Sequence, residues 1–445
     1  MFSLSLQGSY VQRTYLYGVY LKHMTAYISN FETLATTPLR RDALAIVEAA
    51  YEAIDTKAVI HKHCTIDSGI LHIAQSSYNL SSYEHIYVIG FGKASCTAVS
   101  ALEEVLTKYL SEGVVIDKSP GTCQTVKVYQ GTHPIPTAQN VNLSEKITEL
   151  AIKATDKDLV IVVVSGGGSS LLCFPMSECD QGAKLYASFL TTGGTISELN
   201  TLRKHLSSVK GGGLAKLLYP ATVASLIFSD VPGDSYEEVA SGPTYKDTTT
   251  IEDAQAILKK YSIEQPFIFN ETPKEDMYFK NITNIPLVSN LHAIEGMKRK
   301  AEELGYIVVI QSTEEYREAS LVLSDMKNSL TQKTVVLVAG EPSVVVTHTG
   351  DKGGRNEYAA GVALSLVEEN QVCIPFATDG IDNKSDAAGA LIDTDVKVYA
   401  LQNNILIQEY FMQGKHDELC KDLGIQLITG PTGSNVSDCI IYMQG

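Results

Sequence analysis

The chain has 445 residues, 44% of them hydrophobic, and its 51 acidic residues exceed its 35 basic residues to give a formal net charge of −16. This length is typical of two or three domains with buried cores, and the acidic balance argues against a nucleic-acid-binding surface. No apolar run reaches the ~18–20 residues that cross a bilayer. The eight cysteines show no zinc-type spacing, so we expect reduced thiols in a cytoplasmic protein without nucleic-acid or membrane partners.

The first thirty residues differ from the rest, because they contain no Asp or Glu and carry Arg13, Lys22 and His23. A basic, acid-poor segment is also typical of transit peptides. We treat residues 1–36 as an N-terminal extension and predict no function for it.

From residue 37 onward, predicted strands alternate with predicted helices. Apolar residues at helical spacing over 39–54 indicate an amphipathic helix, and a β-branched run over 85–90 indicates a strand. The same patterns predict further elements over 113–118, 143–153, 159–164 and 223–228. This alternation is typical of a mostly parallel sheet covered by helices on both faces. We assign it to a first domain at 37–275.

A segment of mixed polarity and little periodicity, 266–286, separates this domain from a second one. Beyond it, β-branched runs predict strands over 285–290, 306–311, 334–340, 342–349 and 373–380. Helical periodicity recurs over 291–304 and 357–369. We therefore predict a second, smaller α/β domain with a mixed sheet at 276–445.

The motif GFGKAS at 90–95 follows the first predicted strand and allows two interpretations. It resembles a dinucleotide-binding finger, for which Asp117 at the end of the next strand would approximate the ribose ligand. Alternatively, Lys93 stands at a helix N-terminus against the helix dipole because it meets an anionic ligand. Both interpretations remain open from the sequence.

The motif SGGGSS follows the β-branched strand over 159–164 and predicts an anion-binding loop. Its glycines permit close approach of the backbone, and its serines can bond phosphate oxygens. No Walker A pattern occurs in the chain, and a tight turn without a ligand is the alternative. The predicted cofactor-binding residues of this loop are Ser165, Gly166, Gly167, Gly168, Ser169 and Ser170.

The segment 200–213 places Arg203, Lys204 and His205 shortly before a second glycine cluster that begins after Lys210. A charge run is usually a solvated helix face. Because this one leads into glycines, we predict that Lys210 and Gly211 also bind the cofactor.

Aspartates and one arginine complete the predicted site. Asp230 follows the strand over 223–228 and Asp379 follows the strand over 373–380, at strand ends where open α/β sheets place ligands. Either carboxylate can bind Mg²⁺ or accept a hydroxyl proton. Arg355 follows flexible glycines and precedes a helix, and its planar fork suits a phosphoryl group. We predict Lys93, Arg355 and Asp230 as catalytic, and Asp230 and Asp379 as metal ligands.

Taken together, seven segments resemble the type II glycerate kinases, whose C-terminal portion is called the MOFRL domain. They occur in the family's order and cover the chain from about Leu39 to its end: GFGKAS, SGGGSSLL, NTLRKHLSSVKGGGLA, SDVPGDSYEEVASGPT, GEPSVVVTHTGDKGGRNEYA, TDGIDNKSDAAGALID and TGPTGSNVSD.

The resemblance implies an α/β protein with a Rossmann-like N-terminal domain, a smaller C-terminal domain and an active site in the cleft between them. It also implies ATP-dependent, Mg²⁺-dependent phosphorylation of D-glycerate to 2-phosphoglycerate, with Lys93 and Arg355 as catalytic residues, and we expect a homodimer. Two other functions remain open. One is an NAD(P)-dependent hydroxypyruvate reductase that uses the 90–95 finger and Asp117, and the other is a non-catalytic phosphosugar-binding regulator.

Overall fold

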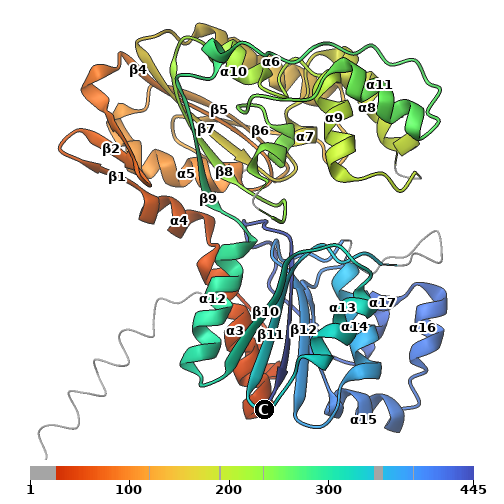
Figure 1. Ribbon diagram of the computed structural model, residues 1–445. Coiled ribbons are helices and arrows are strands. Elements are labelled where there is room, and N and C mark those ends of the chain that lie inside the picture. The colour runs from red at the N-terminus through yellow and green to blue at the C-terminus, as the bar shows by residue number, and fades with distance from the viewer. Residues whose placement is uncertain (1–26, 120, 190–191, 234, 345–353, 384) are drawn as a thin grey trace, which may run out of the picture.

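The computed structural model describes residues 27–119, 121–189, 192–233, 235–344, 354–383 and 385–445. These residues form two lobes stacked one on the other (Figure 1). The first lobe is built on a six-stranded parallel sheet and the second on a seven-stranded sheet of mixed direction. The predicted α/β class, with one parallel and one mixed sheet, is therefore confirmed. Residues 1–26 of the predicted N-terminal extension lie outside the described residues.

The first sheet has the strand order β6-β5-β4-β7-β8-β9, and all neighbouring strands are parallel. The chain enters at the centre with β4, winds outward to β6, then returns to β7 beside β4 and winds outward the other way. This is the doubly wound Rossmann order, in which ligands bind outside the carboxyl ends of the strands where the winding reverses. The strands are β4 (His85–Phe91), β5 (Glu112–Asp117), β6 (Lys127–Gln130), β7 (Asp158–Ser165), β8 (Thr222–Phe228) and β9 (Ile282–Val288).

Helices cover both faces of this sheet because its β-branched strands present apolar side chains alternately to each side. Ile161 and Val163 of β7 face the core that contains α5, whereas Val160 and Val162 face the core that contains α6 and α10. The helices of this lobe are α4 (Thr56–His63), α5 (Ser95–Leu106), α6 (Ala138–Lys153), α7 (Gly168–Leu171), α8 (Met176–Phe189), α9 (Ile196–Leu206), α10 (Gly213–Leu218) and α11 (Ile251–Lys260).

Smaller elements complete the first lobe. A three-stranded antiparallel sheet comprises β1 (Cys64–Asp67), β2 (Ile70–Ile73) and β3 (Ser76–Asn79). The short 3₁₀ helices are η1 (Leu80–Ser82), η2 (Thr107–Tyr109), η3 (Tyr236–Ser241) and η4 (Asp276–Tyr278).

In the second lobe, the C-terminal strand β16 lies between β11 and β12 and is antiparallel to both. The sheet order is β10-β11-β16-β12-β13-β15, and β14 also pairs with β12. The strands are β10 (Ile307–Glu315), β11 (Thr334–Gly340), β12 (Gln371–Ala377), β13 (Gly389–Ala390), β14 (Ile392–Asp393), β15 (Gln426–Leu427) and β16 (Asp438–Gln444). The strand predicted over 342–349 reaches residues outside the described ones, and Ser343 forms an isolated bridge with Glu318.

Helices cover both faces of the second sheet as well. Side chains of α3 and α12 pack on one face, and those of α13, α14 and α17 pack on the other. The helices associated with this lobe are α2 (Phe31–Leu34), α3 (Pro38–Ala53), α12 (Asn290–Glu303), α13 (Ala319–Asn328), α14 (Arg355–Leu366), α15 (Thr394–Gln402), α16 (Ile407–Gln413) and α17 (His416–Asp422).

Two segments differ from the predicted division at residue 275. Helix α3 precedes the first sheet in the chain but packs against α12 and against β12 and β16 of the second. Strand β9 follows residue 275 but pairs with β8 in the first sheet. Periodicity predicts that a segment is a helix or a strand and says nothing about which sheet it joins, so the domain limits remain a prediction.

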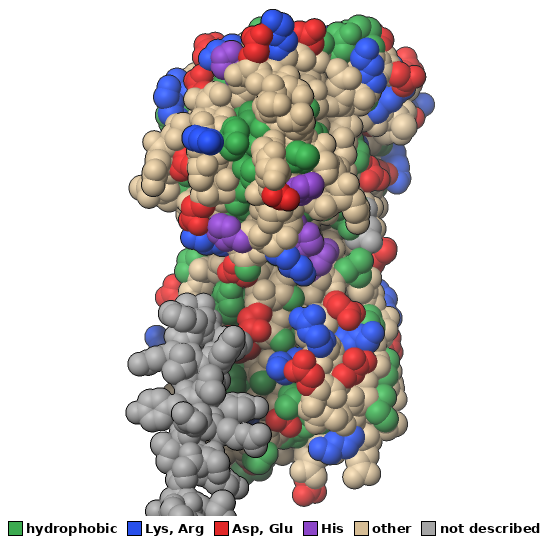
Figure 2. All heavy atoms as spheres, turned by 90° about the vertical axis from the view of Figure 1, so that its left-hand side faces the viewer, with side chains coloured by type: hydrophobic (Ala, Val, Ile, Leu, Met, Phe, Trp, Pro, Cys, Tyr) green, Lys and Arg blue, Asp and Glu red, His purple; other side chains and the backbone are tan. Residues whose placement is uncertain are grey.

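None of the helices that the structure describes is both long and apolar enough to cross a membrane. On the face shown in Figure 2, acidic and basic side chains are interspersed over both lobes. The face therefore carries no broad basic surface of the kind that binds nucleic acid.

The close packing of α3 on α12 depends on Gly296. A Cβ added there would lie 2.4 Å from the Ala49 carbonyl oxygen, so we expect Gly296→Ala to destabilise the protein by about 1–3 kcal/mol through overpacking. Gly182 in α8 has open space around it, and Gly182→Ala should instead stabilise the helix by about 0.5–1 kcal/mol. Urea unfolding of both variants measures the two changes, and equal signs would contradict the packing argument.

Candidate active site

Two glycine loops meet where the winding of the first sheet reverses. Gly92, which follows β4, lies so close to the end of β7 that an added Cβ would come within 2.1 Å of the Ser165 hydroxyl oxygen. The Lys93 N–H donates to the Gly166 carbonyl at 2.9 Å, and the Ala94 N–H donates to the Ser165 hydroxyl at 3.2 Å. The φ of Gly92 is +122°, which suits glycine. This contact holds Lys93 at the carboxyl edge of the sheet.

The backbone N–H groups of the loop after β4, which a dinucleotide would need, are already hydrogen-bonded within the protein. The Gly92 N–H bonds to the Ile116 carbonyl at 3.2 Å, and the Cys96 N–H bonds to Asp117 at 2.9 Å. Asp117 is only 1% exposed and also accepts the Ser119 N–H at 2.9 Å. Burial raises the pKa of Asp117 to about 6, against the opposing effect of these hydrogen bonds. Its carboxylate therefore fixes α5 and the next loop and is not available to a ribose.

The loop after β7 has donors to spare. Within the part of the chain that the structure describes, the N–H groups of residues 166–169 donate to no protein acceptor. Gly167 has φ +77°, and the Ser169 hydroxyl bonds to that of Ser241 at 3.0 Å. Successive unpaired N–H groups on a turn form a concave site for an anion. Residues 166–169 of the predicted loop thus offer N–H groups to a phosphate or a carboxylate, whereas the Ser165 hydroxyl accepts the Ala94 N–H and the Ser170 hydroxyl donates to the Pro134 carbonyl.

Carboxylates from both lobes approach Lys93. Its Nζ lies 3.6 Å from Oδ2 of Asp379, which follows β12 in the second lobe. Asp230, which follows β8 in the first lobe, packs against Gly166, where an added Cβ would lie 2.1 Å from its Oδ2. Asn435 of the second lobe donates to Asp230 at 3.4 Å. The structure therefore brings the predicted residues Lys93, Asp230 and Asp379 together between the lobes.

The environment of Asp230 disfavours its charged form. Burial raises the pKa of Asp230 to about 6, Lys93 opposes this shift, and Glu341 and Asp379 add to it. Such a carboxylate gains free energy from any further cation placed beside it, and pKa values shifted in this way are typical of functional sites.

Arg355 is the first residue of α14 and is held by two carboxylates of the second lobe. One terminal nitrogen donates to Asp438 at 2.8 Å and the other to Glu341 at 3.3 Å. Burial alone would lower the pKa of Arg355, but Asp438 and Glu341 outweigh it and raise the pKa above its usual value. Burial raises the pKa of Asp438 to about 6, with Arg355 opposing.

Asp382 positions the start of α14, and with it Arg355. Its carboxylate accepts the Glu357 N–H at 2.7 Å, and a Cβ added at Gly354 would lie 2.0 Å from its carboxyl carbon. Burial raises the pKa of Asp382 to about 8, and Asp438 adds to the shift. Residues 350–353 of the GDKGGRN segment, and Asp234 of SDVPGD, lie outside the described residues.

The donor set fits Mg²⁺ only together with a ligand. In the described ranges, no three acidic, histidine or cysteine side chains are grouped closely enough to hold a metal ion. Mg²⁺ commonly binds one or two carboxylates and completes its shell with phosphate oxygens and water. Asp230 and Asp379, both near Lys93, could supply the carboxylates.

Lys210 and Gly211, which we predicted to bind the cofactor, are not placed at this cleft. Lys210 is 1% exposed, and its Nζ bonds to Glu178 and to the Leu172 carbonyl. The Gly211 N–H donates to the Ser241 carbonyl at 2.9 Å. These groups hold α10 and α8 against the sheet and leave no donor for a ligand.

Several residues at the cleft were not predicted from the sequence. Glu341, Asn435 and Asp438 come from the ends of β11 and β16, and no pattern in the sequence says that β16 inserts between β11 and β12. His133 lies beside Gly167, where an added Cβ would be 3.0 Å from its ring. A lone histidine in a turn gives no indication of a site from the sequence.

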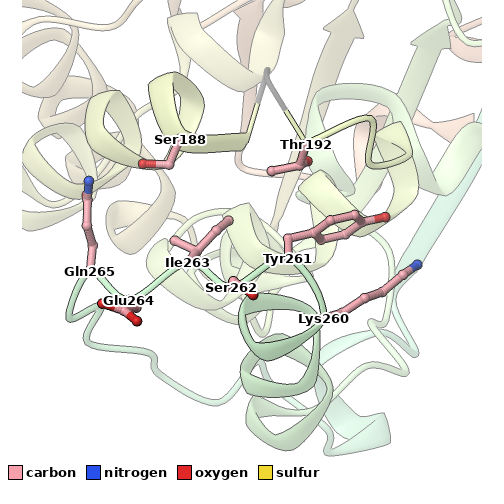
Figure 3. Close-up of a pocket in the computed structure, with 8 residues that line it drawn as sticks. All are labelled: Ser188, Thr192, Lys260, Tyr261, Ser262, Ile263, Glu264 and Gln265. Carbon is pink, nitrogen blue, oxygen red and sulfur yellow. The ribbon is translucent and has the colours of Figure 1, made fainter.

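A hollow elsewhere in the first lobe shows no comparable chemistry (Figure 3). It lies where α8 and α11 end, with Lys260 and Gln265 at opposite ends of its lining. Lys260 is ion-paired with Glu198 at 2.6 Å, and the Tyr261 hydroxyl donates to the same carboxylate at 2.7 Å. None of the predicted site residues lines this hollow.

Comparisons with known proteins bear on this geometry. Residues 42–269 match the domain of unknown function DUF4147, and residues 334–438 match the MOFRL family. Glycerate 2-kinase of Pyrococcus horikoshii is 31% identical over 436 residues, which cover 91% of this chain and 97% of that protein. The chain belongs to the MOFRL-type glycerate kinase family.

Other members of this family support the fold, although their names differ. The crystal structure of glycerate kinase from Thermotoga maritima aligns with a TM-score of 0.78 and 30% identity, over 91% of this chain and 99% of that one. A protein of Agrobacterium vitis with the provisional name hydroxypyruvate reductase is 35% identical over 378 residues, which cover 79% of this chain and 85% of that protein.

For this member of the family, the structure assigns Lys210 to stability. Lys210→Met should leave Glu178 as an unpaired buried charge and destabilise the protein by about 3–5 kcal/mol, without a change in the affinity for a nucleotide. Lys210→Met with Glu178→Gln should recover much of the loss. Urea unfolding and nucleotide titration of the folded protein measure the two quantities. A tenfold loss of nucleotide affinity at unchanged stability would restore the predicted cofactor role.

Proposed function

We propose that this protein catalyses the ATP-dependent phosphorylation of D-glycerate to 2-phosphoglycerate, with Mg²⁺. The observation that carries the proposal is the convergence between the lobes of one lysine, a loop of unpaired N–H groups and carboxylates from both sides. Phosphoryl transfer needs mainly positioning and charge stabilisation, and these groups supply both. Relatives named as glycerate kinases over nearly the whole chain support the choice of acceptor.

Each group has a role in this proposal. Lys93 neutralises charge on the transferred phosphoryl group, and the N–H groups of residues 166–169 bind oxygens of the ligand. Asp230 orients the attacking hydroxyl and accepts its proton, while Asp230 and Asp379 would hold Mg²⁺, which supplies further neutralisation of the phosphates when bound. Arg355 stabilises charge from the second lobe, where Asp438 and Glu341 fix its guanidinium. A cytoplasmic location and a homodimer belong to the same proposal.

The reductase alternative is favoured by the name of the A. vitis relative but not by the site. Hydride transfer would need Gly90–Ser95 as a dinucleotide finger, and its N–H groups already bond to Ile116, Gly166 and Ser165. A non-catalytic regulator would need the anion loop alone. A regulator of this kind would not need the carboxylate of Asp230, whose pKa is raised to about 6, beside Lys93.

The direct test is ³¹P NMR of the full chain with ATP, Mg²⁺ and D-glycerate. We expect a new phosphomonoester resonance whose proton coupling identifies 2-phosphoglycerate. Lys93→Met should lower turnover by about 10²–10³-fold, the range found when one charge-stabilising donor is removed. Lys57→Met, which removes a lysine paired with Glu104 on the surface, should retain full turnover. An unchanged ATP spectrum, with NADH consumed on adding hydroxypyruvate, would overturn the kinase in favour of the reductase.

The pKa of Asp230 predicts a pH dependence. As pH falls through about 6, Asp230 becomes protonated and can no longer accept the hydroxyl proton, so kcat/KM should fall on the acid side. Asp230→Asn should remove this acid limb together with most of the activity. Asp117→Asn removes a carboxyl whose pKa burial also raises to about 6, but its carboxylate is bound by the Cys96 and Ser119 N–H groups and its loss should leave the limb in place.

The raised pKa of Asp230 also affects the free energy of unfolding. For this quantity a fall in pH is favourable, whereas it lowers the activity. Because the folded-state pKa lies above the unfolded value of 3.8, ionised Asp230 costs stability at pH 7, and the cost disappears as pH falls below the unfolded value. Asp230→Asn should therefore be more stable than the parent protein at pH 7 and equal to it near pH 4. Urea unfolding at the two pH values checks this, and a variant less stable at pH 7 would exclude the assigned pKa.

A further inference from the structure

On the first-lobe side of the cleft, Asp230 lies against Gly166 at one end of the anion loop, and basic side chains lie around His133 beside Gly167. Burial, together with the positive charges of Lys93, Lys118 and Arg203, lowers the pKa of His133 to about 4. Glu341, Asp379 and Asp438, in contrast, belong to the second lobe. A ligand that carries its own carboxylate, in addition to phosphate charge, is thus attracted to the first-lobe side.

Arg203 stands at the end of this basic region. It lies in the last turn of α9, a helix that begins with a capping box between Thr195 and Glu198. Its guanidinium lies over the ring of Tyr186, 5.9 Å from the ring centroid, and burial lowers the pKa of Arg203. The side chain lines a hollow whose walls include Pro134, Ser169, Ser170, Tyr186 and Leu206.

Arg203 lacks an acidic partner. Among the described residues, no carboxylate oxygen lies within 4.0 Å of its guanidinium. Glu178 also lines the hollow, but its carboxylate is bound by the Lys210 ammonium group and the Phe174 N–H. A half-buried guanidinium without a counter-charge is costly, and a ligand anion would remove that cost.

Arg355 does not offer an equivalent site. Both of its terminal nitrogens already bond to carboxylates, those of Asp438 and Glu341. Its positive charge is therefore already compensated by carboxylates of the second lobe. Among the described residues, carboxylates bind the guanidinium of Arg355, whereas none lies within 4.0 Å of the guanidinium of Arg203.

We infer that Arg203, together with the Ser169 hydroxyl and the N–H groups of the anion loop, binds the carboxylate of the acceptor acid. This inference rests on the proposed function and adds to it the residue that selects an acid over an uncharged polyol. An arginine fork bonds both oxygens of a carboxylate. The loop runs from Gly167, where an added Cβ would lie 3.2 Å from Cγ of Lys93, to Ser170, which lines the same hollow as Arg203. An acid bound here would direct its carboxylate to Arg203 and its hydroxyl toward Lys93.

The test compares D-glycerate with D-glyceramide, the neutral amide of the same shape. Arg203→Gln should raise KM for D-glycerate by about 10- to 100-fold, the loss of a charge-assisted hydrogen-bond pair, and leave KM for ATP within about twofold. It should also abolish the preference for D-glycerate over D-glyceramide, whereas Arg203→Lys should retain part of it. A merely structural role would weaken both acceptors equally. Arg41→Gln, at an exposed pair with Glu32, is the matched control and should change neither.

The outcomes separate this inference from the proposed function. An unchanged preference in an Arg203→Gln enzyme that still phosphorylates D-glycerate would overturn the carboxylate site and leave the kinase standing. If the parent protein turns over no D-glycerate, calorimetry with D-glycerate decides. Binding that is lost in Arg203→Gln would support the site without the kinase, and no binding by the parent protein would overturn both.

Discussion

The contact between Gly92 and the end of β7 is the constraint on which the cleft depends. The winding of the sheet reverses between β4 and β7, so their loops emerge side by side at one edge. A side chain at residue 92 would overlap Ser165, and the hydrogen bond from Lys93 to Gly166 then fixes the lysine beside the anion loop. The N–H groups of the loop after β4 are used in this contact. The loop after β7 therefore has the N–H groups that can bind a ligand.

The charges of the cleft follow from which lobe supplies them. The first lobe contributes Lys93 and Arg203 around the anion loop, together with the carboxylate of Asp230, and the second contributes Asp379, Asp438 and Glu341. Buried carboxylates with pKa values near 6 lower stability, and they persist where a ligand or metal compensates for them. A phosphate with its Mg²⁺ supplies both signs of charge and would neutralise both sides at once.

The lobes are also coupled mechanically. Lys93 reaches Asp379 across the cleft, and Asn435 reaches Asp230 in the opposite direction. Helix α3 precedes the first sheet in sequence but packs on the second through Gly296 and α12. A movement of one lobe against the other must therefore change the distance between Lys93 and the second-lobe carboxylates, the distance on which closure around a substrate would act.

The sequence by itself determined the elements and the loops. Continuous β-branched runs predicted β4 and β7, because strands buried on both faces are apolar throughout. Helical periodicity predicted α3 and α14, and the glycines of SGGGSS predicted a tight anion-binding loop. Sequence reasoning also named Lys93, Asp230 and Asp379, which do converge. Tertiary structure alone decided the rest: that β9 joins the first sheet, that β16 inserts beside β12 and delivers Asp438, that Lys210 is a buried ion pair, and that no carboxylate of the described residues pairs with Arg203. Pairing and burial depend on residues distant in the chain, and no local pattern records which distant residues those are.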